Sequence, residues 1–220
     1  MGKLLNIVQH LHRSTKRDYL ERMNNNKVYC MNIARKFGFH FWDGKRSFGY
    51  GGHKYILDRW SAVANLIIKK YRLKNNSKIL DVGCGKGYLL YEIKKKLPTV
   101  EVTGFDISSY AINNSKLEIK SNLFVHNAKN KFPYENNKFD LVISLACLHN
   151  LKIFDLVKSL KEIQRVGKKS YIMVESYRNC KELFNLQCWA LTAESFFDPK
   201  EWKYIFHMSN YKGDYEFIYF

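Results

Sequence analysis

The chain has 220 residues, of which 46% are hydrophobic and 15% aromatic, enough for a packed core and against a chain that is disordered throughout. Its formal net charge is +17, from 37 Lys and Arg against 20 Asp and Glu, which invites nucleic acid or another acidic partner. The 28 lysines outnumber the 9 arginines and are scattered, often beside asparagine, so a compositional bias of a solvated surface is the favoured interpretation.

The apolar runs, the N-terminal stretch and the cysteines indicate the cellular compartment of the protein. No apolar run approaches the roughly 20 residues of a membrane span, and the charged N-terminal stretch does not have the pattern of a secretory signal. Asn6 stands where the myristoylation motif after Gly2 requires Ser or Thr. The five cysteines are odd in number and include no CxxC pair, so we expect reduced thiols, no metal site and a cytoplasmic location.

Two units are predicted along the chain. Residues 1–70 have mostly helical patterns and are predicted to form an N-terminal cap or lid segment, whereas residues 71–220 alternate between apolar strand patterns and amphipathic helix patterns. Residues 185–199 fit neither pattern. In chain order the second unit is predicted to contain a strand at 77–83, a helix at 88–97, a strand at 100–106, a helix at 108–119, strands at 121–128 and 139–147, a helix at 154–167, a strand at 169–176, a helix at 199–210 and a strand at 213–220.

This alternation predicts the fold class. Strands separated by helices are joined by right-handed crossovers and run parallel. We therefore expect an α/β fold, a Rossmann-like, doubly wound and mainly parallel sheet with helices on both faces, preceded by the helical cap. Ligands of such sheets bind outside the carboxyl ends of the strands. The first predicted strand of the series ends in a glycine-rich loop, so a ligand site is expected there.

The glycine-rich loop reads "DVGCGKG", with glycines at every second position. The dinucleotide fingerprint GxGxxG is not met, because Tyr88 stands in the place of its last glycine. A phosphate P-loop is excluded, since no GK[ST] closes the loop. A plain strand-to-helix turn would not need three alternate glycines, each of which loses backbone entropy on folding.

The loop and its surroundings resemble the class I S-adenosylmethionine (SAM) dependent methyltransferases. The stretch "ILDVGCGKGYLL", residues 79–90, is similar to the first motif of that family, and the resemblance extends over residues 75–175. It implies SAM as cofactor and S-adenosylhomocysteine as product. An acidic residue ending the second strand binds the adenosine ribose in the family, and "VTGFD" supplies Asp106. The family's Asp-Ala pair beside the adenine is Asn127-Ala128 here, a mild departure.

Physical chemistry agrees with this resemblance. SAM carries no phosphate, so the glycines serve a close approach of the backbone, which a Cβ would block. Asp106 can accept from both ribose hydroxyls. Asp81 can face the cationic end of the cofactor or brace the loop, and Cys84 packs or offers its backbone. The cofactor-binding set implied by the resemblance is Asp81, Gly83, Cys84, Gly85, Gly87, Asp106, Ile107, Asn127, Ala128 and Ser144.

The sequence indicates the methyl acceptor less clearly than the cofactor. The loop after the fourth strand reads "SLACLHN", without the [NDS]-P-P-[YF] pattern of base N-methylation, and Cys147 lacks the preceding proline of a cytosine C5 nucleophile. His149 in this loop is a candidate base, with a packed or capping histidine as the alternative. Glu175 ends the fifth strand and is a second candidate, with a salt bridge to Arg178 or a lysine as the alternative. Glu194 is a third residue that could reach the site.

The segment "FGYGGHKY", residues 48–55, precedes the first motif and combines glycines with aromatic residues. In methyltransferases of this type the corresponding segment often folds over the bound cofactor. We therefore predict a lid that excludes water, with Tyr50 as the residue in direct contact and an ordinary anchored loop as the alternative. His149, Glu175 and Tyr50 together form the predicted catalytic set.

These features favour a SAM-dependent methyltransferase that acts on a small molecule, with saccharides and nucleotide-linked metabolites among the candidates. No nucleic-acid recognition module is present in the sequence: it has no RNP pattern, zinc knuckle or KH loop. An RNA or protein methyltransferase that uses the basic surface is the alternative, and a catalytically inactive SAM-binding module is a further one.

Overall fold

A computed structural model describes residues 2–50 and 54–220 of the chain. Within these residues the strands form one six-stranded sheet in the order β3-β2-β1-β4-β5-β6, and every neighbouring pair is parallel. The predicted doubly wound fold with a helical N-terminal region is confirmed, and all six predicted strands are present. The strands are β1 (Lys78–Val82), β2 (Glu101–Asp106), β3 (Leu123–Val125), β4 (Leu141–Leu145), β5 (Ser170–Glu175) and β6 (Asp214–Ile218).

Helices cover both faces of the sheet because the strands alternate between two apolar faces. In β1, Ile79 packs into the cluster that contains α5 and α6, whereas Leu80 packs into the cluster that contains α9 and α11. The first face is covered by α5 (Ser61–Tyr71), α6 (Tyr88–Lys96), α7 (Ser109–Asn113) and α8 (Leu117–Lys120), and the second by α9 (Ile153–Val166) and α11 (Pro199–Met208).

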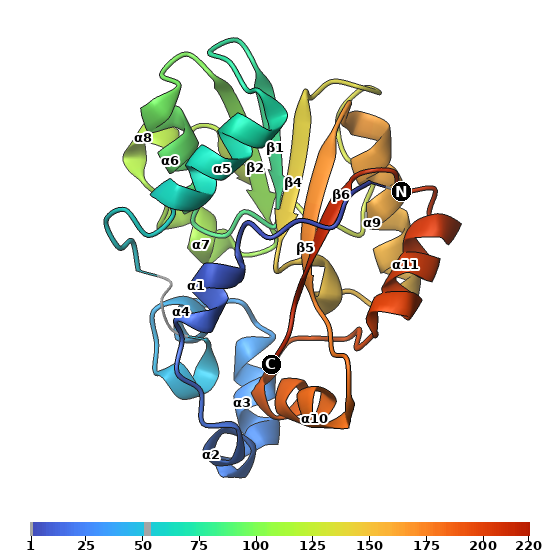
Figure 1. Ribbon diagram of the computed structural model, residues 1–220. Helices are drawn as coiled ribbons and strands as arrows, with labels where there is room; N and C mark the ends of the chain where they lie inside the picture. Colours follow the sequence, from blue (N-terminus) through green and yellow to red (C-terminus); the bar gives the residue numbers. More distant parts are fainter. Residues whose placement is uncertain (1, 51–53) are drawn as a thin grey trace.

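The helical N-terminal region contains α1 (Gln9–Arg13), α2 (Tyr19–Asn24), α3 (Lys27–Ala34), α4 (Phe39–Trp42) and the 3₁₀ turn η1 (Arg46–Phe48). Figure 1 shows α2, α3 and α4 gathered with α10 (Cys180–Trp189) at the end of the molecule toward which the strand arrows point. This helical group therefore lies over the carboxyl ends of the strands, where ligands of doubly wound folds bind. The 3₁₀ turn η2 (Leu148–Asn150) follows β4 at the same edge.

The division into units at residue 70 stays a prediction, but packing separates two parts of the N-terminal region. Val63 and Ile67 of α5 are fully buried in the same cluster as the sheet, together with Ile7 and Val8. A separate small cluster joins Cys30, Ala34 and Phe41 to Leu191, which follows α10. The segments around α3 and α4 thus share a core with α10.

The N-terminal segment covers the outer edge of the sheet. Leu4 forms a parallel bridge with Tyr215 of β6, and the amide of Leu5 donates to the Tyr215 carbonyl at 2.8 Å. Behind this bridge the buried Glu216 carboxylate accepts hydrogen bonds from the amides of residues 7–9 and from the Tyr171 hydroxyl. A buried carboxylate needs such partners, so Glu216 fixes the chain at the start of α1.

Two sequence-based expectations need correction. The helix predicted at 108–119 is two short helices, α7 and α8, separated at residues 114–116. Ser108 nevertheless caps α7 as predicted, because its side chain accepts from the Ala111 amide. Residues 185–189 are the second half of α10 rather than irregular.

Candidate active site

A cavity of about 500 Å³ lies at the carboxyl ends of β1, β2, β4 and β5, beneath the helical group. Its size suits a ligand of a few hundred cubic ångströms. The lining combines the loops that follow the strands with aromatic residues of the N-terminal region, namely Phe37, Phe41, Trp42, Tyr50 and Trp60. The predicted site therefore lies where the fold class placed it.

The glycine-rich loop connects β1 to α6 in a conformation that side chains rarely adopt. Gly83 and Gly85 line the cavity with φ values of +76° and +55°. A Cβ on Gly83 would overlap the Cys147 side chain, and a Cβ on Gly85 would lie 2.7 Å from the Trp42 ring. The glycines are needed here because protein side chains pack directly against the loop.

Gly87 and Ser144 belong to the predicted cofactor set but do not line the cavity. Gly87 has φ +70° and begins α6, with Ile119 and Leu123 filling the space beside it. Ser144 is fully buried, and its hydroxyl donates to the Val82 carbonyl at 2.9 Å. Side chains alternate along β4, so Ser144 points to the opposite face of the sheet from Leu145, which does line the cavity.

Asp106 ends β2, and its carboxylate lies at the cavity. One oxygen accepts from the Gly85 amide at 2.9 Å and the other from the Ser108 amide at 2.8 Å. Burial raises the pKa of this carboxyl, and the hydrogen bonds from backbone amides act in the opposite direction. Asp106 is therefore the residue that braces the glycine-rich loop, and each oxygen retains a second lone pair for a ligand.

Asp81 is the next-to-last residue of β1 and is only 5% exposed. Its carboxylate lines the cavity and forms no hydrogen bond or ion pair with any residue in the described ranges. Burial and the nearby Asp106 charge raise the pKa of Asp81 to about 7. The alternative that Asp81 braces the loop is not supported, because Asp106 makes those contacts. A buried carboxyl without a partner suits a ligand that brings hydrogen-bond donors or positive charge.

The ends of β2 and β3 form one wall of the cavity. Ile107, Asn127 and Ala128 of the predicted cofactor set line it, together with His126. Nε2 of His126 is buried and has no hydrogen-bond partner within the described chain, whereas Oδ1 of Asn127 accepts from the Lys129 amide at 3.1 Å. This wall offers apolar surface with one unpaired ring nitrogen, which suits a planar heterocycle. Cys84 also lines the cavity, and burial raises the pKa of its thiol.

A cover formed by residues 37–43 closes over the glycine-rich loop, and the sequence did not reveal it. The Trp42 indole lies over Gly85 and donates from Nε1 to the Ser108 hydroxyl at 2.8 Å. The Asp43 carboxylate accepts from Lys86 Nζ at 2.7 Å through both oxygens. Lys86 is only 6% exposed, so this ion pair is buried and ties the N-terminal region to the loop.

Tyr50 lines the cavity as predicted, and its hydroxyl joins the N-terminal region to the segment after α10. This hydroxyl accepts from the Leu191 amide at 2.9 Å and lies 3.1 Å from the Thr192 hydroxyl. Burial raises the pKa of Tyr50, so the phenol stays protonated near neutral pH. The rest of the predicted lid stays a prediction, because residues 51–53 lie outside the described residues.

His149, in the turn η2, and Glu175, at the end of β5, meet at the cavity. The Glu175 amide donates to Nδ1 of His149 at 3.3 Å, and Nε2 of the same ring lies 3.5 Å from Glu175 Oε2. That oxygen is buried and lacks a hydrogen-bond partner in the described residues. Burial lowers the pKa of His149, which keeps the ring neutral. The alternative of a salt bridge from Glu175 to Arg178 or a lysine is not met among the described residues, and Arg178 pairs with Glu182.

Two further polar residues complete this corner of the cavity. Glu194 lines it and pairs with Arg35 of the N-terminal region at 3.1 Å. Asn150 donates its amide to the carbonyls of Ala146 and Cys147, and leaves Oδ1 buried without a partner in the described chain. Ala146 has φ +56°, an unusual conformation for alanine that places this loop at the cavity.

The charge of the cavity differs from that of the chain as a whole. Among the described residues the lining contains five carboxylates against three lysines, and Lys86 is already paired with Asp43. The unpaired atoms are mostly hydrogen-bond acceptors: the Asp81 carboxylate, Glu175 Oε2 and Asn150 Oδ1. The cavity is therefore suited to a ligand with positive charge or several hydrogen-bond donors, although the chain carries a net charge of +17.

A family model described as a methyltransferase domain matches residues 73–210. Ribosomal RNA small subunit methyltransferase C of Buchnera aphidicola subsp. Schizaphis graminum is 32% identical over 152 residues, which cover 64% of this chain and 44% of that protein. Mouse arginine-hydroxylase NDUFAF5 is 31% identical over 117 residues, 53% of this chain and 33% of that protein. The chain thus spans less than half the length of these curated relatives.

Solved structures share the fold. A putative methyltransferase from Bacillus halodurans C-125 has a TM-score of 0.55 at 17% identity, with 66% of this chain and 67% of that chain covered. A putative methyltransferase from Haloferax volcanii, in complex with the Trm112 methyltransferase activator, has a TM-score of 0.52 at 17% identity, with 70% and 77% covered. At these identities the likeness concerns the fold alone.

Proposed function

Because the chain belongs to the class I SAM-dependent methyltransferase family, we propose that it transfers a methyl group from SAM to a small-molecule acceptor, such as a saccharide or a nucleotide-linked metabolite. The observation that carries this proposal is the pair of carboxylates at the cavity, Asp81 without a partner and Asp106 on the loop, beside a cover of aromatic residues. The cover leaves a cavity of about 500 Å³.

The residues of the cavity fit the cofactor. Asp81 is buried, has no partner within the described residues and suits the positive charge of SAM. Asp106 retains lone pairs that can accept from ribose hydroxyls while it holds the Gly85 amide. The wall at His126 and Asn127 suits the adenine ring. The cavity volume lies within the range of known small-molecule sites.

The chain's own residues then position the acceptor and handle its proton. SAM supplies the electrophilic methyl group. Glu175 Oε2 accepts a hydrogen bond from an acceptor N–H or O–H and takes up the proton as the new bond to carbon forms. His149 holds Glu175 in place through the hydrogen bond that its Nδ1 accepts from the Glu175 amide, so it is a positioning residue. Trp42 and Tyr50 exclude water from the reacting pair.

Calorimetric titration with SAM tests the cofactor assignment without an acceptor. Asp106→Ala should weaken binding by at least about 2 kcal/mol, because it removes a charged hydrogen-bonding partner. Asp140→Ala is the matched control: Asp140 also accepts a backbone amide, from Lys78, but does not line the cavity. Equal SAM affinity of the two variants would contradict the assignment. NAD should not bind measurably.

Release of S-adenosylhomocysteine from purified protein and pooled acceptors tests the acceptor class. Release with a small-molecule pool and not with RNA or protein supports the proposal. Release with RNA or protein alone overturns its acceptor part, and SAM binding without release from any pool favours the inactive-module alternative.

The cytoplasmic location also stays part of the proposal: all five cysteines are free thiols in the described chain, and no described helix is long and apolar enough to cross a membrane.

RNA is the second candidate acceptor. The relative named as a ribosomal RNA methyltransferase and the net charge of +17 favour it. The excess of carboxylates over lysines in the cavity lining speaks against it. If the charge is only compositional, binding to RNA or duplex DNA will be weak and steeply salt-dependent. Sequence-selective submicromolar binding at about 150 mM salt would favour RNA over a small molecule.

A further inference from the structure

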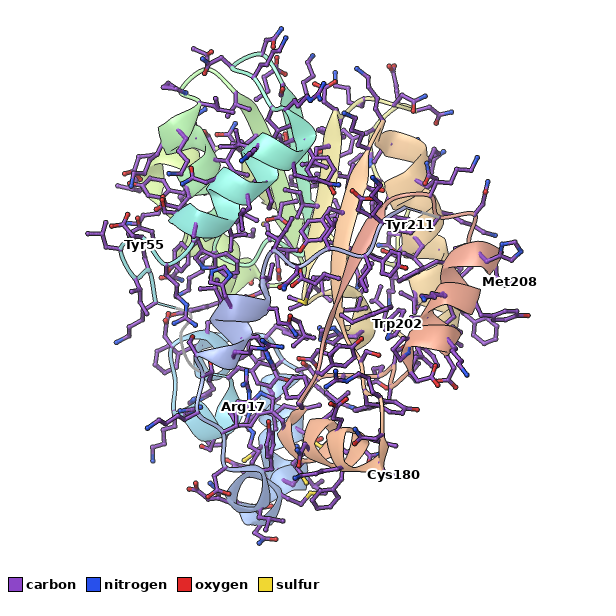
Figure 2. The ribbon with its side chains drawn as sticks, in the orientation of Figure 1. Arg17, Tyr55, Cys180, Trp202, Met208 and Tyr211 are labelled. Atoms are coloured by element: carbon purple, nitrogen blue, oxygen red, sulfur yellow. The ribbon has the colours of Figure 1, made fainter. Side chains whose placement is uncertain are left out.

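A second cavity, of about 400 Å³, lies in the helical group, between the start of the chain and α10. Four basic residues and two acidic residues line it, in contrast to the acidic lining of the first cavity. Figure 2 places Arg17 in this part of the molecule, between α1 and α2. The charged residues of the lining are Lys16, Arg17, Arg22, Arg46, Asp18 and Glu21.

Three arginines of this cavity surround one aromatic ring. The guanidinium carbons of Arg17, Arg22 and Arg46 lie 5.3, 4.7 and 5.4 Å from the centroid of the Trp189 ring. We call these three residues the arginine cluster. Guanidinium groups are drawn to the face of an aromatic ring, but three positive charges around a single ring repel one another.

None of the three arginines forms an ion pair with a carboxylate of the described residues. Their hydrogen-bond acceptors are backbone carbonyls. Arg22 donates to three of them, on Trp189, Arg46 and Gly49, whereas Arg46 donates only from Nη2, to Lys16. Nε of Arg17 is buried without a partner in the same residues. The cluster is therefore rich in positive charge and incompletely hydrogen-bonded.

Burial and the repulsion between neighbouring positive side chains disfavour the charged forms in and around the cluster. Burial lowers the pKa of Arg17 and of Arg22, and the neighbouring Arg46 acts in the same direction on both, whereas the Glu175 carboxylate acts in the opposite direction on Arg17. Burial, with the Arg22 charge, lowers the pKa of Lys27 to about 8. A group that carries negative charge would relieve this repulsion.

The second cavity adjoins the acceptor side of the first. Tyr50 lines the first cavity and Trp189 lines the second, and their ring centroids are 6.2 Å apart. The Arg22 guanidinium lies over both rings, 5.6 Å from Tyr50 and 4.7 Å from Trp189. The two cavities thus meet at this pair of rings, and the Glu175 carboxylate of the first cavity is near enough to act on the pKa of Arg17 in the second.

We propose that the arginine cluster binds a phosphoryl group carried by the methyl acceptor, so that the second cavity holds the anionic end of a phosphorylated small molecule whose reacting end reaches Glu175. This inference rests on the proposed function and narrows the acceptor class to phosphorylated metabolites, of which a nucleotide-linked compound is one.

Free donors of the cluster support a phosphoryl ligand. Nε and Nη1 of Arg46 donate to no group of the described chain, and Nη2 uses one of its two N–H bonds for the Lys16 carbonyl. The second Nη2 N–H is parallel to an N–H of Nε or of Nη1, so one two-donor edge of the guanidinium stays available. Such an edge matches two oxygens of a phosphate. Arg46 is exposed, so a ligand can reach it, whereas Arg22 already holds three carbonyls and serves the fold.

Calorimetry at constant ionic strength, with inorganic phosphate, pyrophosphate and a nucleoside diphosphate as probes, tests the site. We expect pyrophosphate and the nucleoside diphosphate to bind the full chain, and Arg46→Gln to weaken both at least tenfold. Arg72→Gln, which removes one positive charge at the end of α5, should stay within twofold of wild type. Arg46→Gln loses the hydrogen bond from the Arg46 side chain to the Lys16 carbonyl. Thermal unfolding therefore checks that this variant remains folded.

Each outcome decides for or against the site. Equal weakening by Arg46→Gln and Arg72→Gln, or no binding of pyrophosphate to wild type, overturns the proposal. Binding of inorganic phosphate alone reduces the cluster to a free-anion site and overturns acceptor docking. Displacement of the nucleoside diphosphate by S-adenosylhomocysteine would place it in the first cavity and also overturn the proposal, whereas simultaneous binding supports it.

A short oligoribonucleotide forms a further arm of the experiment. Binding of the oligoribonucleotide that is lost in Arg46→Gln, without binding of the nucleoside diphosphate, would overturn the small-molecule ligand in favour of RNA. SAM affinity is measured on the same samples and should not change in Arg46→Gln. If no form of the protein binds SAM, the proposed function fails. The anion measurements then decide only whether the arginine cluster binds a phosphoryl group.

Discussion

The Glu175 amide donates to Nδ1 of His149, while Nε2 of the same imidazole lies 3.5 Å from the Glu175 carboxylate. Because Nδ1 accepts, the proton of the neutral ring is on Nε2 and faces Oε2 of Glu175. His149 thus contacts its neighbour through both nitrogens, and the group with a free lone pair at the cavity is Glu175. The two residues form one unit in which only the carboxylate is free for an acceptor.

This arrangement predicts different effects for the two residues. Glu175→Gln should lower kcat at least tenfold, about 1.4 kcal/mol in the barrier, and leave SAM affinity within threefold. His149→Gln should raise KM and lower kcat together, because Glu175 is then mispositioned. Burial lowers the pKa of His149, so the wild-type rate should show no inflection at the ordinary imidazole value of 6.5. An inflection there that disappears in His149→Gln would assign the proton transfer to His149 instead.

The buried ion pair between Lys86 and Asp43 should be important for stability. Replacing either partner removes the counter-ion of a largely buried charge, so Lys86→Met or Asp43→Asn should lower the free energy of unfolding by about 3–5 kcal/mol. The double variant should cost less than the sum of the two single variants. Urea unfolding measures these changes. Lys168→Met is the control: its pair with Asp140 is exposed, and about 0–1 kcal/mol is expected. Similar losses in Lys86→Met and Lys168→Met would contradict the role of the cover.

Gly85 is predicted to be intolerant of a methyl group. Gly85→Ala places a Cβ 2.7 Å from the Trp42 ring at φ +55°, so stability should fall by more than about 1 kcal/mol and SAM binding should weaken. Gly38→Ala adds the same methyl group at φ −91° with nothing within 4 Å, and should be neutral or slightly stabilising. Thermal unfolding and SAM titration of both variants provide the comparison. A harmless Gly85→Ala would mean that Trp42 does not lie over the loop.

Asp81 should make SAM binding depend on pH. Its pKa is raised to about 7, so below that pH the carboxyl must lose a proton before it can face a positive charge. Affinity should therefore fall as the pH drops below 7, by up to tenfold per unit, and level off above 7. Asp81→Asn removes this dependence, and the difference between the two titrations isolates Asp81 from the ionisation of the ligand itself. Parallel curves for both proteins would show that Asp81 does not meet the cofactor.

The sequence allowed much of the cofactor side to be predicted, because strand patterns and the glycine spacing are local. Asp106 was expected at the strand end and lies there, although its bonds to Gly85 and Ser108 were not foreseen. Ser144 does not line the cavity, because its hydroxyl donates to the Val82 carbonyl inside the sheet, and no local pattern marks that hydrogen bond.

The cover over the loop could not be predicted in the same way. Asp43 and Lys86 are 43 positions apart, and nothing near either residue marks the pair. The Trp42 indole over Gly85 is equally a matter of tertiary packing. The α10 helix was missed because its apolar residues pack against the N-terminal helices rather than the sheet, so half of its pattern was not recognised. The cover and α10 therefore depend on packing between segments far apart in the sequence, which local patterns do not reveal.

The hydrogen bonds from the amides of residues 7–9 to the Glu216 carboxylate affect the order in which the parts of the protein fold. These partners are separated by 207 to 209 positions, so the opening residues cannot settle until the last strand has been synthesised. Until then β6 is missing and β5 is left as an unpaired edge, which is prone to join other chains. Partly synthesised chains should therefore depend on chaperones more than the finished protein does.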